Sequence, residues 1–117
     1  MTDSLQAIRS RIQAFVEERD WQQVHSPKNL AMAMIVEAAE LVEHFQWMTE
    51  QESREVSAEK KEQIGQELAD TFVYMLRIAD VLEIDLIDAT NRKLDINAKK
   101  YPVEKARGRN DKYTEYQ

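Results

Sequence analysis

The sequence predicts an all-α fold built from four helices. Only two Gly and two Pro occur in the 117 residues, which leaves little of the turn chemistry that β-hairpins need. Apolar residues instead recur at steps of three or four residues along most of the chain, which is the spacing of one helix face. We expect a four-helix-bundle-like arrangement in a single domain over residues 1–117, with a basic tail from about residue 103.

Apolar spacing and a start signal predict the first two helices. The first helix is expected to end near Asp20, and its apolar positions are Leu5, Ile8, Ile12, Phe15 and Val16. Ser26-Pro27 predicts the next start, because serine caps helices and proline suits the first helical position. The second helix should run to about Met48. Its inward residues are expected to be Leu30, Met34, Leu41, Phe45 and Met48.

The second half of the chain supplies two more helices. Residues 49–57 are polar and are expected to form a connection, and Ser57, with an acid two residues later, marks the third start. The third helix should present a stripe of Ile64, Leu68, Phe72, Met75, Ala79 and Leu82. A shorter fourth helix is predicted from Leu86 to about Lys100. It should stop at Tyr101-Pro102, because the residue before proline disfavours helical backbone.

Two acidic pairs lie within the second and third predicted helices. Glu37-Ala-Ala-Glu40 and Glu67-Leu-Ala-Asp70 each have the i, i+3 spacing that puts two side chains on one helix face. Both pairs fall at the edge of an apolar face, where unpaired carboxylates would be desolvated at a cost. One such pair would be chance in acid-rich helices, but two in consecutive helices predict a cleft with four carboxylates. Those carboxylates repel one another unless a cation neutralises them.

Oxygen ligands in that number suit Mg²⁺, with Mn²⁺ as the other choice. A di-iron bundle would need Glu-x-x-His motifs, and neither pair has one, since His44 follows Glu40 by four residues. His44 could bridge to Glu40 or ligate the metal. The chain has no cysteine for a thiolate zinc site or a disulfide.

Charge is unevenly distributed along the chain. Residues 1–90 carry 8 Lys/Arg against 18 Asp/Glu, and residues 91–117 carry 8 against 4. An acidic scaffold with a basic end does not resemble a nucleic-acid polymer binder. It suits a small phosphorylated ligand held between metal and lysines, or simply a soluble surface. With no signal-like segment and no apolar run long enough for a membrane, a cytoplasmic protein is expected.

A longer series of motifs resembles the all-α nucleoside triphosphate pyrophosphohydrolases of the MazG-like group, and within it the dCTP pyrophosphatases. The resemblance covers roughly residues 15–114. Besides the two acidic pairs, its motifs are Glu18-Arg-Asp-Trp21, His25, Pro27, Asn29-Leu30, Phe45-Gln-Trp47, Asp95-Ile-Asn97, Tyr101-Pro102 and Lys112-Tyr-Thr-Glu115.

The resemblance implies a homo-oligomeric enzyme, a dimer or tetramer, that cleaves a nucleoside triphosphate between its α and β phosphates. By the same implication the four acids, Glu37, Glu40, Glu67 and Asp70, hold magnesium and form the catalytic set. Glu37 or Glu40 is expected to accept the proton of the attacking water. The implied base and sugar pocket consists of Trp21, His25, Trp47 and Tyr74, and the implied phosphate contacts are Lys93, Asn97 and Tyr101.

One position departs from the pattern. The animal dCTP enzymes place a histidine nine residues before the tryptophan, where this chain has Ile12. Losing that donor and acceptor predicts a weaker recognition of cytosine and a broader or shifted substrate range. We expect a substrate such as dCTP or a related or modified pyrimidine nucleotide. The alternative is a non-catalytic nucleotide-binding or interaction module on the same bundle, which the intact acidic quartet argues against.

Overall fold

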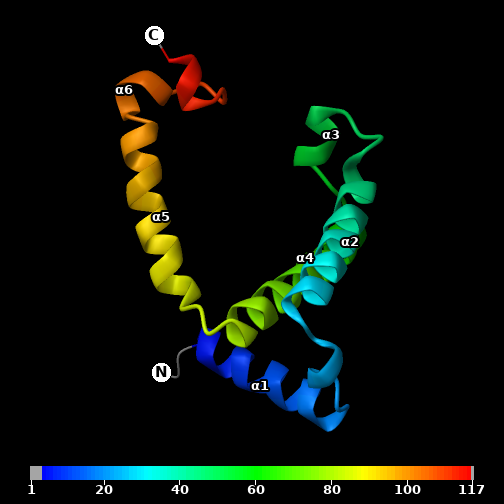
Figure 1. Ribbon diagram of the computed structural model, residues 1–117. Helices are drawn as coiled ribbons and strands as arrows, with labels where there is room; N and C mark the ends of the chain where they lie inside the picture. The colour runs from blue at the N-terminus through cyan, green and yellow to red at the C-terminus, as the bar shows by residue number, and fades with distance from the viewer. Residues whose placement is uncertain (1–3, 117) are drawn as a thin grey trace. The chain divides into compact units, whose positions relative to one another are not determined.

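The computed structural model describes residues 4–116, and these residues contain helices but no strands (Figure 1). The all-α prediction is therefore confirmed. The α-helices are α1 (Ser4–Glu18), α2 (Pro27–Phe45), α3 (Glu50–Arg54), α4 (Ala58–Val81), α5 (Leu86–Lys100) and α6 (Val103–Ala106). Short 3-10 turns lie at η1 (Gln22–Val24) and η2 (Tyr113–Glu115). The chain divides into two compact units, residues 1–83 and 84–117.

Side-chain caps set the starts of the helices. The Ser26 hydroxyl accepts a hydrogen bond from the Asn29 backbone N–H, with Pro27 at the first helical position, as the sequence predicts. Ser57 caps α4 in the same way, and Asp85 caps α5. Each cap satisfies a backbone N–H that would otherwise have no partner.

Two boundaries differ from the expectation. Helix α2 ends at Phe45 instead of Met48, and the predicted connection contains the short helix α3. The Thr49 side chain accepts from the Glu52 backbone N–H while the Glu52 carboxylate accepts from the Thr49 backbone N–H. Both residues of this reciprocal capping box are polar, so polar composition alone did not distinguish a short helix from a loop.

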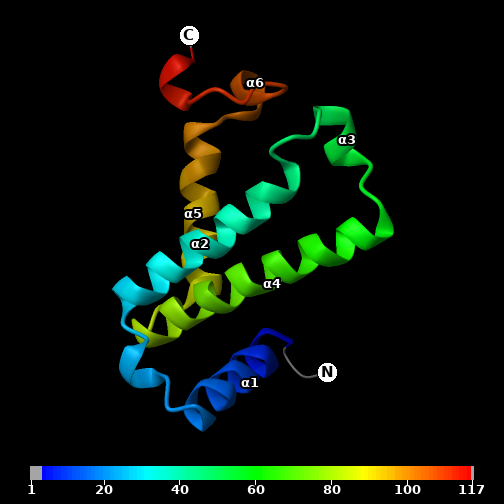
Figure 2. The same ribbon diagram turned by 90° about the vertical axis from the view of Figure 1, so that its right-hand side faces the viewer.

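In the first unit α2 and α4 lie side by side and antiparallel (Figure 2). Helix α1 packs against the C-terminal part of α4. The Arg9 guanidinium pairs with the Asp80 carboxylate at 2.6 Å, and the Arg77 guanidinium donates to the Gln13 amide oxygen at 2.7 Å. Because 9 pairs with 80 and 13 with 77, α1 also runs antiparallel to α4.

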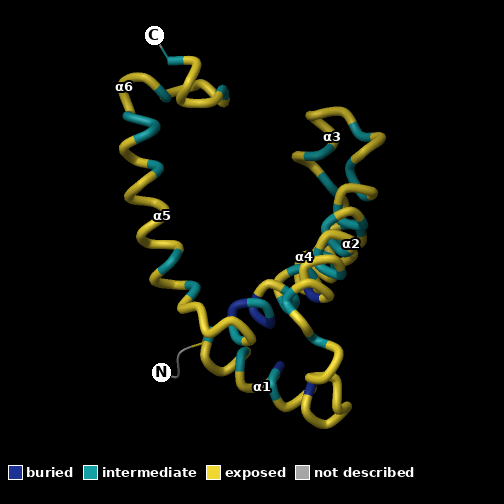
Figure 3. Tube along the Cα trace, viewed as in Figure 1, coloured by how far each residue is buried: buried dark blue, intermediate teal, exposed yellow. Residues whose placement is uncertain are grey.

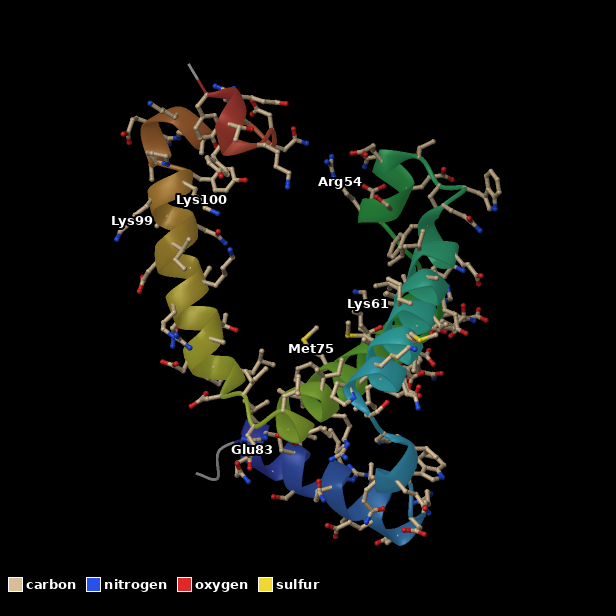
Figure 4. The ribbon with its side chains drawn as sticks, in the orientation of Figure 1. Arg54, Lys61, Met75, Glu83, Lys99 and Lys100 are labelled. Carbon is tan, nitrogen blue, oxygen red and sulfur yellow. The ribbon has the colours of Figure 1, made fainter. Side chains whose placement is uncertain are left out.

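Among residues 4–116 the buried apolar side chains come from α1, α2 and α4 (Figure 3), and they are Ile12, Val16, Leu30, Leu76 and Ala79. The inward residues expected on α2 are buried or half-buried. Within the stripe expected on α4, Ala79 is buried, whereas Leu68, Phe72, Met75 and Leu82 are exposed. Figure 4 shows Met75 projecting away from α1. Helices α1 and α2 therefore leave part of this apolar stripe uncovered.

The second unit contains α5, α6 and η2. The Tyr101 ring makes edge contacts with the rings of Tyr113 and Tyr116, at centroid distances of 5.9 and 5.8 Å. Arg109 pairs with Asp111 within the same segment. The segment expected as a basic tail thus has local order of its own. Among residues 4–116 no helix has the length and apolar character needed to cross a membrane.

Candidate metal centre and adjoining pocket

Helices α2 and α4 bring carboxylates from both acidic pairs together. One oxygen from each of Glu37, Glu67 and Asp70 lies within 4.8 Å of the other two. Glu37 comes from α2, and the other two come from α4, where three residues make almost one helical turn. Glu37 and Glu67 are half-buried, whereas Asp70 is exposed. The antiparallel packing of the two helices therefore makes one acidic cluster from two distant motifs.

Glu40 joins the cluster at its side. Its half-buried carboxyl is within hydrogen-bonding reach of the carboxyls of both Glu37 and Glu67. It is not one of the three groups whose oxygens converge within 4.8 Å of one another. The four predicted acids are thus neighbours, with three arranged around one point and Glu40 adjacent to two of them.

The cluster holds the pKa of two of its members above their ordinary value. Burial is the largest cause for Glu37, followed by the hydrogen bond and charge of Glu40 and by the charges of Asp70 and Glu67. Burial and Glu40 likewise raise the pKa of Glu67, while the nearby His44 lowers it. Bringing like charges together disfavours their ionised forms. The folded chain alone therefore holds these acids at an electrostatic cost.

Two oxygens of the cluster have no hydrogen-bond partner in the described part of the chain. Glu37 Oε2 and Glu67 Oε2 are both buried and without a hydrogen bond among the described residues. Buried carboxylate oxygens without a donor are costly, so a ligand that binds oxygen is expected there. Three converging carboxylates, with no sulfur or nitrogen ligand in the group, fit a hard divalent cation.

His44 approaches Glu67, not Glu40 as the sequence suggested. Its Nε2 lies 3.8 Å from Glu67 Oε1, and its Nδ1 lies 3.2 Å from the Lys60 ammonium. An ammonium group only donates hydrogen bonds, so Nδ1 accepts and Nε2 carries the ring hydrogen. His44 thus presents its Nε2 to one oxygen of Glu67, while Glu67 Oε2 is left without a partner among the described residues.

A pocket of about 430 Å³ adjoins the cluster. Glu37 and Asp70 lie in its wall, together with three of the predicted base and sugar contacts, Trp21, His25 and Tyr74. The remaining lining comes from α1 and α4 and consists of Ile8, Arg11, Ile12, Phe15, Val16, Val73 and Arg77. The Trp21 ring contacts Phe15 edge-on, with centroids 5.7 Å apart. The pocket is therefore an aromatic and aliphatic cavity with carboxylates in its wall.

The other predicted substrate residues are not in this pocket. Trp47 follows the end of α2 and is 89% exposed. Lys93 and Asn97 lie on α5, and Tyr101 caps that helix. These three belong to the second unit, where the Asn97 carbonyl accepts from the Tyr101 backbone N–H at 2.8 Å.

Sequence reasoning missed Arg77 and Lys60. Arg77 is 4% exposed and lines the pocket. Its signal was available, because it is the one charged residue in the apolar run from Thr71 to Ala79 and follows Asp70 by seven residues, which is nearly two turns. Lys60 gave no such signal, since its contact with His44 depends on how α2 and α4 are paired.

Comparisons with known proteins place the chain in a family. The MazG-like family model matches residues 32–116. Human dCTP pyrophosphatase 1 is 39% identical over 114 residues, which cover 96% of this chain and 67% of the human protein. The rat protein of that name is 38% identical over the same shares.

A solved structure also matches. The crystal structure of a pyrophosphatase from Archaeoglobus fulgidus is 37% identical, covers 87% of this chain and 95% of its own, and superposes with a TM-score of 0.82. The resemblance seen in the sequence is confirmed by these matches. The chain belongs to the MazG-like family.

Proposed function

We propose that this protein is a nucleoside triphosphate pyrophosphohydrolase that releases a nucleoside monophosphate and pyrophosphate. The observation that carries the proposal is the convergence of Glu37, Glu67 and Asp70, with two unpartnered oxygens, beside an aromatic pocket. The relatives named dCTP pyrophosphatase and the related pyrophosphatase structure support the same reaction class. A bound Mg²⁺, or Mn²⁺ in its place, would neutralise phosphate charge and polarise the attacking water.

In this proposal each group of the site has a role. Glu37, Glu67 and Asp70 hold the cation through oxygens that have few other partners. Glu40 stands beside the trio and is the better placed of the two candidate bases, because its oxygens are not part of the converging set. Trp21, His25 and Tyr74 enclose the base and sugar.

The second unit and the oligomer complete the proposed enzyme. We retain the prediction that residues 1–117 act as one domain, with Lys93, Asn97 and Tyr101 meeting the phosphates and Trp47 contributing to base binding. Lys93 supports this assignment because it begins the basic part of the chain. The substrate is proposed to be dCTP or a related or modified pyrimidine nucleotide, and the cellular role is nucleotide-pool clean-up. A non-catalytic nucleotide-binding module is the alternative.

Replacing the proposed catalytic acids tests the reaction. We expect Glu40→Ala and Asp70→Ala each to lower pyrophosphate release from dCTP with Mg²⁺ by more than about 100-fold, since even outer partners of metal ligands contribute 10–100-fold. A coupled assay for pyrophosphate across the four deoxynucleoside triphosphates measures the effect.

Glu43→Gln is the matched control, because Glu43 is an exposed acid on the same helix. Full activity in both alanine variants would remove the site assignment. Nucleotide binding by the wild-type protein, without pyrophosphate from any triphosphate, would support the binding module instead.

Metal binding should depend on pH through the raised pKa values. Folding raises the pKa of Glu37 and Glu67, so these carboxyls ionise more easily in the unfolded chain than in the folded one. The free energy of unfolding of the metal-free protein should therefore fall as the pH rises from the unfolded pKa through the folded pKa. Mg²⁺ binds the ionised form and competes with protons. The rise in melting temperature on adding Mg²⁺ should therefore be larger at about pH 8 than at about pH 5, as calorimetry can measure.

Glu37→Gln should abolish the rise in melting temperature on adding Mg²⁺. It should also reduce the loss of stability that the metal-free protein shows as the pH rises. Glu43→Gln should behave as wild type in both measurements. A response that was independent of pH, or that survived Glu37→Gln, would contradict the assignment of Glu37 as a ligand.

Exposed apolar side chains support a homo-oligomer. One face of α2 carries Met32, Ile35, Val36 and Val42, exposed at 58%, 64%, 55% and 58%, and α4 carries Leu68, Phe72 and Met75. Contiguous exposed apolar patches of this kind mark interaction sites. This face of α2 lies opposite Leu30 and Leu41, so it is separate from the residues that pack on α4.

A charge on that face should dissociate the oligomer. We expect Ile35→Glu to shift the mass measured by light scattering from a dimer or tetramer toward the 13.7 kDa chain. Gln51→Glu makes the same charge change at an exposed polar site on α3 and should leave the mass unchanged. A wild-type protein that is monomeric at all concentrations tested would overturn this proposal.

A further inference from the structure

Arg77 is a buried cation that the fold does not neutralise. It is the one charged residue that is fully buried among residues 4–116, at 4% exposure. Within those residues it has no carboxylate in ion-pair distance. Its Nη1 donates to Gln13 Oε1 at 2.7 Å, whereas its Nε is buried without a partner. A buried guanidinium with an unsatisfied donor is costly, so packing alone is a poor reason for its presence.

Gln13 holds the guanidinium in one orientation. The Gln13 amide nitrogen donates to Glu17 Oε1 at 2.7 Å, so its oxygen is left to face Arg77. The two bonds form a chain from Glu17 through Gln13 to Arg77 and link α1 to α4. The guanidinium anchored in this way is preorganised to donate its remaining hydrogens to a planar acceptor.

Arg77 lies at a defined distance from the acidic cluster. Asp70, Val73, Tyr74 and Arg77 share one face of α4 and all line the pocket. Seven residues separate Asp70 from Arg77, or about 10 Å along the helix. A nucleotide whose phosphates lie at the carboxylates can therefore extend past Tyr74 and bring its base toward Arg77.

Arg77 is the one buried cation among the groups that line this pocket. Ile12 and Val73 have no polar side-chain atoms, and Arg11 is exposed. Burial, and then the charge of Arg77, lower the pKa of His25, so its imidazole is neutral near pH 7. His25 Nδ1 is also buried without a partner. A ligand that binds here would meet the cationic guanidinium of Arg77 and Nδ1 of the neutral His25 ring.

We propose that Arg77 is the base-reading residue of this pocket and that it takes the 2-oxo edge of a pyrimidine. The inference rests on the proposed function. A guanidinium donates hydrogen bonds and accepts none, so it pairs with adjacent acceptors such as the O2 and N3 atoms of cytosine. Adenine carries no carbonyl oxygen and presents an amino group beside its ring acceptors, so the buried donor would be poorly matched.

The test compares cytosine and adenine nucleotides on Arg77 variants. Arg77→Met keeps a long side chain but removes its hydrogen-bond donors. Arg77→Lys keeps the positive charge but removes the planar guanidinium. We expect Arg77→Met to lower the ratio of kcat/KM for dCTP to that for dATP by about 10- to 100-fold, mainly through KM. Its affinity for dCMP over dAMP, measured by calorimetry without metal, should fall alike, and Arg77→Lys should show a smaller loss.

The matched control is Arg54, an exposed arginine of α3 that pairs with Glu50 (Figure 4). Arg54→Met should leave both ratios unchanged. Circular dichroism and melting curves show which variants are folded. The wild-type protein gives a readout that needs no variant: it should bind CMP about 10-fold more tightly than 2-thio-CMP, whose sulfur is a poor acceptor.

The outcomes separate the two proposals. A wild-type protein that releases no pyrophosphate but loses cytosine preference with Arg77→Met would contradict the proposed reaction and keep the base-reading role. An active protein whose folded Arg77 variants retain the wild-type ratio would overturn the base-reading role and leave the reaction standing. Equal binding of CMP and 2-thio-CMP would likewise overturn it.

Discussion

The repulsion among the carboxylates of α2 and α4 is the constraint on which the site depends. The two helices pack antiparallel, and this packing brings Glu37 against Glu67 and Asp70. Burial and like charge raise the pKa of Glu37 and Glu67, and each of these two acids has an oxygen without a partner. The fold alone gains nothing from this cluster, and the cation we propose would supply the missing interaction.

The pocket also holds a buried charge without a partner of opposite sign, in this case a cation. Arg77 is buried without a carboxylate, and its Nε lacks an acceptor, as Glu37 Oε2 lacks a donor. The acidic cluster and Arg77 lie about two helical turns apart on α4. A nucleotide with a metal-bound phosphate group and an acceptor-bearing base would satisfy both ends. The buried groups without partners therefore indicate where the proposed ligand would carry a cation and where it would carry hydrogen-bond acceptors.

Local signals predicted the helices and the two acidic pairs, because caps and i, i+3 spacing act within one element. Ser26 and Ser57 cap where expected. The place of both pairs at the edges of apolar faces also predicted that Glu37, Glu67 and Asp70 would meet. Other features that depend on pairing between helices were not predictable. The apolar pattern of α4 did not reveal which side α1 and α2 cover, so the exposure of Leu68 and Phe72 could not be predicted from it. The contact between Lys60 and His44 arises only once α2 and α4 are paired.

We propose that Glu37, Glu67 and Asp70 together hold a divalent cation. Anomalous diffraction from crystals grown with Mn²⁺ tests it most directly, since the signal locates the ion without reference to activity. We predict an anomalous peak between α2 and α4, within bonding distance of oxygens from all three carboxylates. Well-ordered carboxylates with no peak between them, or a manganese ion bound only at other residues, would contradict it.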